Sequence, residues 1–154
     1  MNEQTSKLMF SSENEVWATP QDFYDKLHAE FNFTLDPCTN GENAKCPTYF
    51  TAEDDGLAQD WAPHTVFMNP PYGRKINDWL EKAYQESLKG ATVVALIPAR
   101  TETRYWHDYC MQADEIRLVK GRLKFGGAKH NAPSPSAVIV FRNNQRKTPK
   151  LEAM

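Results

Sequence analysis

The segment that decides the fold covers residues 65–97 and reads TVFMNPPYGRKINDWLEKAYQESLKGATVVALI. Thr65 to Met68 is a short apolar run typical of a buried strand, and it stops at the stiff sequence Asn69-Pro70-Pro71-Tyr72. Apolar residues then recur at helical spacing, and Gly90 ends the predicted helix. Thr92 to Ile97 is a continuous apolar run, typical of a parallel strand that is covered on both faces. The segment therefore predicts a strand–helix–strand unit with a polar loop after its first strand.

The rest of the chain repeats this alternation. Thr19-Pro20-Gln21-Asp22 predicts a helix start with Thr19 as its cap, and Phe23, Leu27 and Phe31 follow at helical spacing. Further expected elements are strands over 33–35, 116–119 and 137–141, a helix over 102–111, and a polar loop over 38–63. This order predicts a three-layer, Rossmann-like α/β domain with a mostly parallel sheet. We expect a flexible N-terminal segment over 1–15, one compact domain over 16–142 and a basic, polar tail over 143–154.

Bulk composition narrows the class of protein. The chain has 154 residues, of which 40% are hydrophobic and 25% charged, as in an average soluble domain. It contains no apolar run near the roughly 18 residues of a membrane span and no signal sequence, which predicts a cytoplasmic protein without a membrane partner. Cys38, Cys46 and Cys110 form no Cys-x-x-Cys pair, and the histidines show no metal-ligand spacing. We therefore expect reduced thiols and no metal.

Charge is distributed unevenly along the chain. Nine of the 18 Lys and Arg residues lie between Arg117 and Lys150, whereas 19 of the 20 Asp and Glu residues precede residue 116. The first 115 residues therefore have a net charge of −10, and residues 116–150 have one of +9. Such asymmetry favours a protein that presents one face to a polyanion, although a solvated basic tail would look the same.

Asn69-Pro70-Pro71-Tyr72 is the segment that suggests chemistry. In open α/β sheets ligands bind beyond the carboxyl ends of the strands, where this loop is expected to lie. The amide oxygen of Asn69 and the main-chain carbonyl of Pro70 can accept both N–H bonds of an amino group, and Tyr72 offers a flat face to an aromatic base. Two such acceptors would make an aromatic amine a better nucleophile toward a methyl donor. The bare tetrapeptide is also compatible with an ordinary turn.

Beyond this tetrapeptide, the chain resembles the phage-encoded DNA N-6-adenine methyltransferases, the phage Dam-like family. The matching stretches are WATP at 17–20, LDPC at 35–38, DGL at 55–57, Trp61, FMNPPYG at 67–73, GRLKF at 121–125 and PSPSAVIVF at 133–141. The resemblance implies a methyltransferase fold and S-adenosylmethionine as the methyl donor. It also implies a DNA substrate whose adenine is flipped out before its N6 amino group is methylated, and a phage or prophage origin in a bacterial host.

The resemblance also assigns expected roles to individual residues. Asn69, Pro70, Pro71 and Tyr72 would be catalytic, and donor contacts would come from Trp17, Thr19, Pro20, Asp36, Pro37, Cys38 and Asp55. Phe125 is similar in position to an aromatic residue that packs against the flipped base. Arg122, Lys124 and Lys129 lie beside it in the sequence and are candidate phosphate contacts. No Gly-x-Gly follows Asp36, so the donor site lacks the usual glycine fingerprint.

Two other functions fit part of this pattern. Enzymes that methylate glutamine side chains in proteins have a similar Asn-Pro-Pro-Tyr signature, because the same acceptors can hold a carboxamide. A non-catalytic DNA-binding module could also retain a methyltransferase fold. The basic C-terminal third and the extent of the resemblance favour methylation of DNA. The sequence carries no signal for an oligomeric state.

Overall fold

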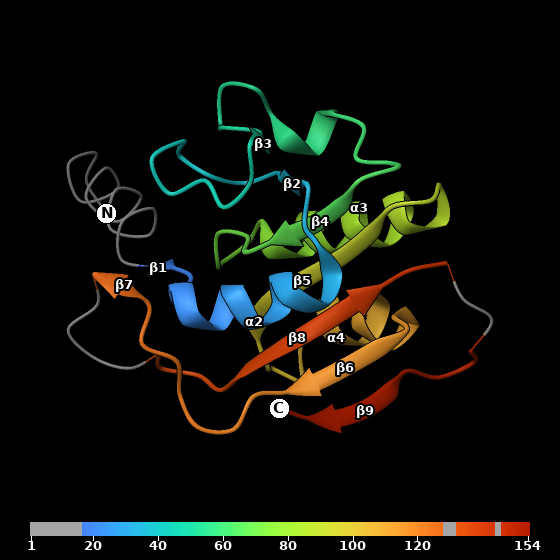
Figure 1. Ribbon diagram of the computed structural model, residues 1–154. Helices are drawn as coiled ribbons and strands as arrows, with labels where there is room; N and C mark the ends of the chain where they lie inside the picture. Colours follow the sequence, from blue (N-terminus) through green and yellow to red (C-terminus); the bar gives the residue numbers. More distant parts are fainter. Residues whose placement is uncertain (1–16, 128–131, 144–145) are drawn as a thin grey trace.

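A computed structural model describes residues 17–127, 132–143 and 146–154. A seven-stranded sheet lies between helix α2 on one face and helices α3 and α4 on the other (Figure 1). The elements in chain order are β1 (Trp17–Ala18), α2 (Gln21–Phe31), β2 (Leu35–Asp36), β3 (Thr48–Tyr49), the 3₁₀ turn η1 (Gly56–Ala58), β4 (Thr65–Met68), α3 (Ile76–Leu88), β5 (Thr92–Pro98), α4 (Arg104–Asp108), the 3₁₀ turn η2 (Cys110–Gln112), β6 (Glu115–Leu118), β7 (Gly126–Gly127), β8 (Ser136–Phe141) and β9 (Lys150–Ala153).

The sheet is mostly parallel. Its order is β3-β2-β4-β5-β8-β6-β9, and of these seven strands only β8 runs antiparallel to its neighbours. The carboxyl ends of β2, β4, β5 and β6 therefore lie along the same edge, on the left in Figure 1. A separate antiparallel pair joins β1 to β7, so that the segment before α2 meets the connection between β6 and β8. This mixed, mostly parallel sheet confirms the predicted Rossmann-like α/β fold.

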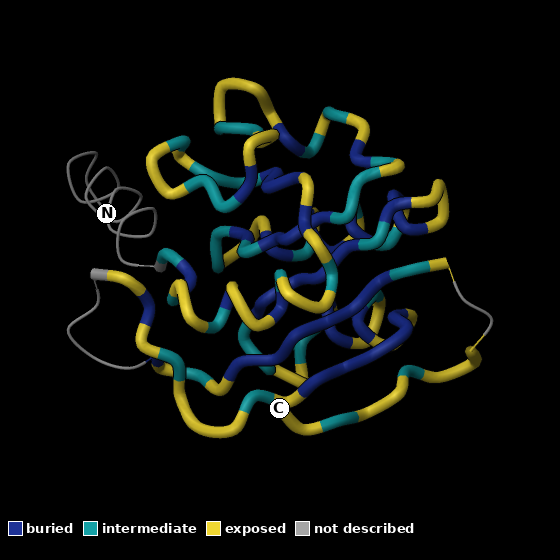
Figure 2. Tube along the Cα trace, in the orientation of Figure 1, coloured by how far each residue is buried: buried dark blue, intermediate teal, exposed yellow. Residues whose placement is uncertain are grey.

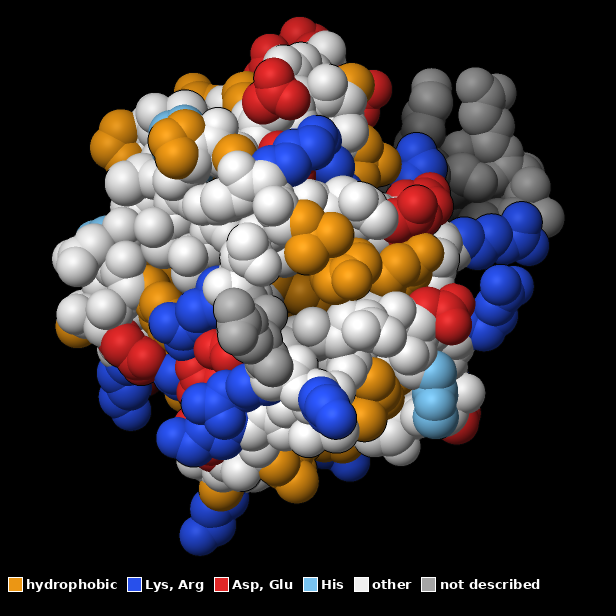
Figure 3. Space-filling view, turned by 90° about the vertical axis from the view of Figure 1, so that its right-hand side faces the viewer, with side chains coloured by type: hydrophobic (Ala, Val, Ile, Leu, Met, Phe, Trp, Pro, Cys, Tyr) orange, Lys and Arg blue, Asp and Glu red, His pale blue; other side chains and the backbone are white. Residues whose placement is uncertain are grey.

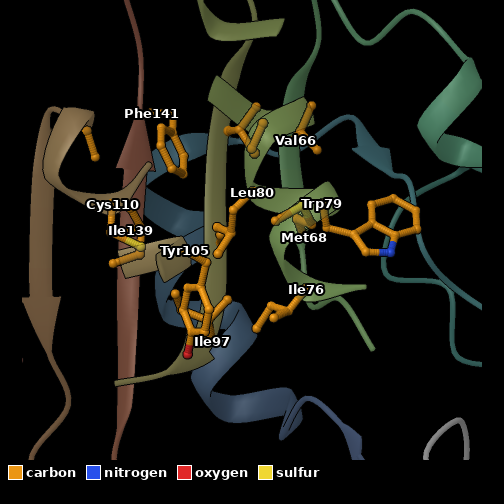
Figure 4. Packing of buried hydrophobic residues seen from close by; sticks show 14 of the residues in the cluster. Val66, Met68, Ile76, Trp79, Leu80, Ile97, Tyr105, Cys110, Ile139 and Phe141 are labelled. Carbon is orange, nitrogen blue, oxygen red and sulfur yellow. The ribbon is translucent and has the colours of Figure 1, made fainter. Parts of the chain in front are cut away.

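Alternate residues of the central strands pack on opposite faces of the sheet. In β5, Val93, Ala95 and Ile97 join the core under α3 and α4, whereas Val94 and Leu96 join the core under α2. Figure 4 shows the first of these clusters, in which Ile97 lies close to side chains from both helices. The central strands are buried along most of their length, and β9 at the edge is largely exposed (Figure 2). Burial on both faces explains why β5 is a continuous apolar run.

The structure agrees with the sequence most closely around the quoted segment. The strand Thr65–Met68 is confirmed as predicted, the helix that follows it is α3, and β5 is one residue longer than expected. The helix predicted over 102–111 is shorter, because it divides into α4 and η2. The strand expected over 33–35 lies at Leu35–Asp36 instead, and β3 falls in the region predicted as loop.

The predicted tail over 143–154 contains a strand of the sheet. Lys150–Ala153 form β9, which pairs in parallel with β6 through main-chain bonds such as Lys150 N–H to the Asp114 carbonyl. An edge strand is paired on one side only and β9 is mostly exposed, so its sequence needs no alternating apolar pattern. The predicted N-terminal segment, 1–15, lies outside the described residues. Among the described residues, none of the helices has the length and apolar character that crossing a membrane requires.

Candidate active site

A pocket opens where β2 and β4 end, at the carboxyl edge of the sheet. It takes side chains from the segment before α2, from the loop after β2 and from the loop after β4. The lining residues are Ala18, Thr19, Asp36, Cys38, Thr39, Asn40, Asn43, Lys45, Phe67, Asn69, Pro70, Pro71 and Tyr72. The pocket therefore brings together the whole Asn69–Tyr72 motif and three of the predicted donor contacts, at the strand ends where α/β folds bind ligands.

Asn69 is held from the segment before α2. Its Nδ2 donates a hydrogen bond to Oγ1 of Thr19 over 3.0 Å, although the two residues are 50 positions apart. The prediction that Thr19 caps α2 is therefore wrong: Pro20 occupies the N-cap position, and the helix start has no side-chain cap bond. Thr19 is only 4% exposed and uses its hydroxyl in the pocket instead.

Asp36 is the acidic group of the pocket. The Asp36 carboxylate accepts a hydrogen bond of 3.0 Å from the main-chain N–H of Lys45, and the Asp36 main-chain carbonyl accepts one from the N–H of Phe50. Burial raises the pKa of Asp36 to about 6, and the hydrogen bonds from the N–H groups of Lys45 and Cys38 only partly oppose this rise. Burial likewise raises the pKa of the Cys38 thiol, so that thiol stays protonated at neutral pH.

Lys45 supplies a positive charge that no sequence pattern reveals. Among the described lining residues it is the only cation, and Asp36 is the only carboxylate. Its Nζ donates to Oε1 of Gln21 over 2.8 Å, and its carbonyl accepts the hydroxyl of Tyr24, which ties the loop to α2. Lys45 lies in a polar loop without periodicity, so its position in the pocket depends on folding of the loop back onto Asp36.

Tyr72 lies between the two halves of the core. Its ring packs against both core clusters and meets the ring of Phe125 edge-on, with 6.3 Å between centroids. Burial raises the pKa of Tyr72, so its hydroxyl remains neutral. Phe125 is only 1% exposed and belongs to the core under α2. The two aromatic residues singled out in the sequence are therefore in contact, with Tyr72 on the pocket wall.

Comparison with known proteins identifies the family. Residues 6–150 match the family DNA N-6-adenine-methyltransferase (Dam). The chain belongs to this family. It is 33% identical over 139 residues to the DNA N-6-adenine-methyltransferase of Haemophilus phage HP1 (strain HP1c1), which covers 84% of this chain and 80% of the phage protein. It is also 43% identical over 65 residues to the Escherichia coli (strain K12) protein named "Putative methyltransferase YfdM", covering 38% of this chain and 71% of that protein.

As a member of the Dam family, the protein is a DNA methyltransferase that acts on the N6 amino group of adenine. The family implies a DNA substrate and S-adenosylmethionine as the methyl donor. In the part of the chain that the structure describes, no three His, Cys, Asp or Glu side chains are grouped closely enough to hold a metal ion.

Three further predicted donor contacts, Pro20, Pro37 and Asp55, are not among the described lining residues. Pro20 is the N-cap of α2, and Pro37 is buried between two lining residues in the sequence, Asp36 and Cys38. Asp55 is exposed and lies outside the lining, but its neighbour Gly56 packs directly against the carbonyl of Pro37. Trp17 belongs to β1, and its side chain is outside the described part of the structure.

The candidate phosphate contacts lie in the connection between β6 and β8. Arg122 is exposed, and its guanidinium donates to the carbonyls of Ala132 and Pro133, which holds the two arms of this connection together. Lys124 is exposed next to the buried Phe125. Lys129 falls outside the described residues.

Folding neutralises much of the basic C-terminal third. Arg117 makes two bonds of 2.8 and 2.7 Å to the Glu30 carboxylate, and Arg142 and Arg146 both pair with Asp114. These pairs gather where β6 begins and β8 ends, at the edge opposite the pocket. Figure 3 looks onto that side and shows Lys and Arg side chains interleaved with Asp and Glu. The charge of +9 in the sequence therefore does not mark a single basic face.

Asp36 is expected to make stability depend on pH. Its pKa rises from 3.8 to about 6, so between these values the folded protein binds a proton that the unfolded chain has lost. The carboxyl group therefore lowers the free energy of unfolding as pH rises through this window, by about 3 kcal/mol at most. We expect the stability of Asp36→Asn relative to the unmodified protein to increase from pH 4 to pH 7 in urea unfolding. A difference that does not change with pH would contradict this assignment.

Proposed function

We propose that this pocket binds S-adenosylmethionine beside a flipped adenine and that Asn69 and Pro70 hold the adenine amino group. The observation that carries the proposal is the position of the Asn69–Tyr72 loop, which shares a pocket with the buried carboxylate of Asp36 and the cation of Lys45. Membership of the family gives the reaction, and the lining of this pocket supports binding of both reactants there.

The lining residues suit the chemistry of this donor. Its amino-acid part carries an ammonium and a carboxylate, which Asp36 and Lys45 can match with opposite charges. Its ribose and adenine offer hydroxyl and ring-nitrogen groups, and Thr39, Asn40 and Asn43 place polar side chains in the same lining. The buried ring of Phe67 gives the pocket an apolar wall. Bound here, S-adenosylmethionine supplies an electrophilic methyl group on a sulfonium sulfur.

The residues after β4 act on the adenine. Oδ1 of Asn69 and the carbonyl of Pro70 would accept hydrogen bonds from the two N–H groups of the adenine amine, which localises the nitrogen lone pair. The new N–C bond would form as the S–CH₃ bond breaks and its electron pair stays on sulfur, which leaves as a neutral thioether. Pro70 and Pro71 have fixed φ angles, so the loop keeps these acceptors in place. After transfer the nitrogen carries a positive charge and loses a proton to water, because neither an amide nor a main-chain carbonyl is a base at neutral pH.

Tyr72 and Phe125 support the flipped base. Removing adenine from the duplex costs a few kcal/mol, and stacking on an aromatic face offsets part of that cost. Tyr72 lines the pocket, and the buried Phe125 packs edge-on against it and keeps its ring in position. We assign base stacking to Tyr72 and support of that ring to Phe125.

We expect Lys45→Met to weaken donor binding by about tenfold or more, because a charge-assisted hydrogen bond contributes about 1.5–3 kcal/mol. Methionine keeps the apolar stem and removes only the charge. Calorimetric titration with S-adenosylmethionine measures the affinity, and the rise in melting temperature at saturating donor provides a second readout. Lys26→Met, on the exposed side of α2, is the matched control. Equal affinities in the two variants would remove Lys45 from the donor site.

The DNA-binding face is proposed to be the carboxyl edge around the pocket. Arg74 and Lys75 are exposed directly after the Asn69–Tyr72 loop, and Lys124 is exposed in the connection that follows β6. Because β4 and β6 end at the same edge, these cations flank the pocket from two sides. Such contacts to phosphates would position the duplex while the pocket takes the base. The bacterial host cytoplasm, where DNA is accessible, is the proposed place of action.

Salt dependence tests this face. The logarithm of DNA affinity falls linearly with the logarithm of salt concentration, and each lost phosphate contact makes this negative slope shallower by about 0.9. We therefore expect the slope to become shallower by about 2 in the double variant Lys75→Gln, Lys124→Gln. Fluorescence anisotropy with a labelled duplex measures the affinities. Arg146→Gln, Lys147→Gln removes the same charge at the opposite edge and should leave the slope nearly unchanged. If the Arg146, Lys147 variant changes the slope and the Lys75, Lys124 variant does not, the DNA binds at the opposite edge of the sheet.

A further inference from the structure

The carboxamide of Asn69 is anchored by one residue from a distant part of the chain. Nδ2 of Asn69 donates to Oγ1 of Thr19 over 3.0 Å, and Thr19 is 4% exposed. A side-chain amide that donates through Nδ2 to Thr19 turns its Oδ1 away from Thr19. The hydrogen bond to Thr19 therefore leaves Oδ1, and not Nδ2, as the end of the amide that is available to a ligand in the pocket.

The two ends of a carboxamide are not equivalent for the proposed reaction. The oxygen accepts hydrogen bonds, whereas the NH₂ group only donates them. The adenine amino group presents N–H donors, so only the oxygen end of Asn69 can hold it. With that oxygen engaged, Nδ2 points to the opposite side and needs an acceptor in a partly buried setting, where an unsatisfied donor is costly. The Thr19 hydroxyl is such an acceptor.

Thr19 is itself placed firmly enough for this task. The residue before it, Ala18, pairs with Gly126 between the antiparallel strands β1 and β7. The residue after it, Pro20, is the N-cap of α2, and its carbonyl accepts the Tyr24 N–H of the first helical turn. Thr19 is therefore fixed from both sides by regular structure.

We propose that Thr19 is a positioning residue for methyl transfer, which holds Nδ2 of Asn69 so that Oδ1 accepts from the adenine amino group. The proposal rests on the function proposed above and adds a residue that acts through Asn69. The proposal also predicts that Thr19 matters less when residue 69 is Asp, whose two carboxylate oxygens are equivalent. A carboxylate has two equivalent acceptor oxygens and no N–H group, so a protein with Asp in place of Asn69 has no orientation to lose.

The test is a double-mutant cycle with Thr19→Val and Asn69→Asp. Valine matches threonine in shape and removes the hydroxyl. We expect Thr19→Val to lower kcat on duplex DNA at saturating donor by about tenfold, since the partly buried hydrogen bond to Asn69 is lost. The affinity for S-adenosylmethionine, measured by calorimetry, should change by less than about threefold, since the charged contacts proposed for Asp36 and Lys45 remain. Thr19→Ser retains the hydroxyl and should recover most of the turnover.

The same valine substitution should cost much less in the Asn69→Asp background, by about threefold or less, because no amide remains to be oriented. Equal losses in the two backgrounds would overturn the proposal and assign Thr19 to packing or to donor contact. If Asn69→Asp alone is inactive, the comparison of Thr19→Val with Thr19→Ser decides, and equal turnover in these two variants overturns the proposal. Failure of the proposed function is a separate result, namely near-normal turnover of Asn69→Ala.

Discussion

Asn69→Ala is expected to lower the turnover of methyl transfer by about 10² or more while the protein still binds its donor. The amide oxygen is needed most when the adenine nitrogen becomes tetrahedral, and loss of a comparable transition-state hydrogen bond costs other enzymes about 10²–10³ in rate. Single-turnover transfer of a labelled methyl group to duplex DNA measures the effect. Calorimetry with S-adenosylmethionine and a melting curve show that the donor site and the fold remain intact.

Asn69→Asp is the matched variant for this experiment. It keeps an acceptor oxygen of the same size at the same position and should retain substantial turnover, in contrast to alanine. Near-normal turnover of Asn69→Ala, with donor binding unchanged, would exclude the proposed grip on the amino group. It would leave the α/β fold and the family membership as they stand.

Gly56→Ala is expected to lower both the stability of the protein and its affinity for the donor. A Cβ atom at this position would lie 2.1 Å from the carbonyl oxygen of Pro37 and 3.1 Å from the ring of Trp79. A main-chain oxygen cannot rotate away as a flexible side chain can, so Pro37 must move, and Asp36 and Cys38 move with it. We expect a loss of about 3 kcal/mol or more in the free energy of unfolding, at the upper end of typical overpacking costs.

Gly90→Ala provides the control for this prediction. Gly90 has a positive φ of 115°, and a methyl group added there would meet no described atom within 4 Å, so alanine introduces backbone strain without a clash. It should lower stability by about 1–2 kcal/mol and leave donor affinity unchanged. Urea unfolding and donor titration of both variants measure the difference. Donor affinity that survives Gly56→Ala would show that Pro37 is not a support of the pocket.

Strongly periodic segments were predictable from the sequence, because their pattern reports burial directly. β4, α3 and β5 follow from runs whose apolar residues face the core on one or both sides. The short strands β3 and β9 carry no such pattern, since they are exposed and depend on main-chain pairing with a neighbouring strand. Their existence depends on the finished sheet rather than on their own residues.

The site was predictable where its residues are contiguous and was not where it joins distant segments. Asn69–Tyr72 directly follow the buried strand β4 and Asp36 is the last residue of β2, so their place at the carboxyl edge is set by chain direction. Thr19 has the local signature of a helix cap, but its hydroxyl meets an amide 50 residues away. Likewise, nothing in the local sequence around Arg117 indicates that Glu30 will pair with it. Both contacts join distant segments and form only when the chain folds, so local sequence does not predict them.

The single antiparallel strand of the seven-stranded sheet, β8, lets the connection between β6 and β8 vary in length. Because β8 runs back beside β6, the connection between them leaves and re-enters the sheet at neighbouring points, where the Val119 N–H bonds the Ser136 carbonyl. A connection with its ends already joined can change length at little entropic cost. Changes in the outer part of this connection that keep Phe125 and the pairing of Gly126 with Ala18 should therefore leave the fold and the pocket at β2 and β4 intact.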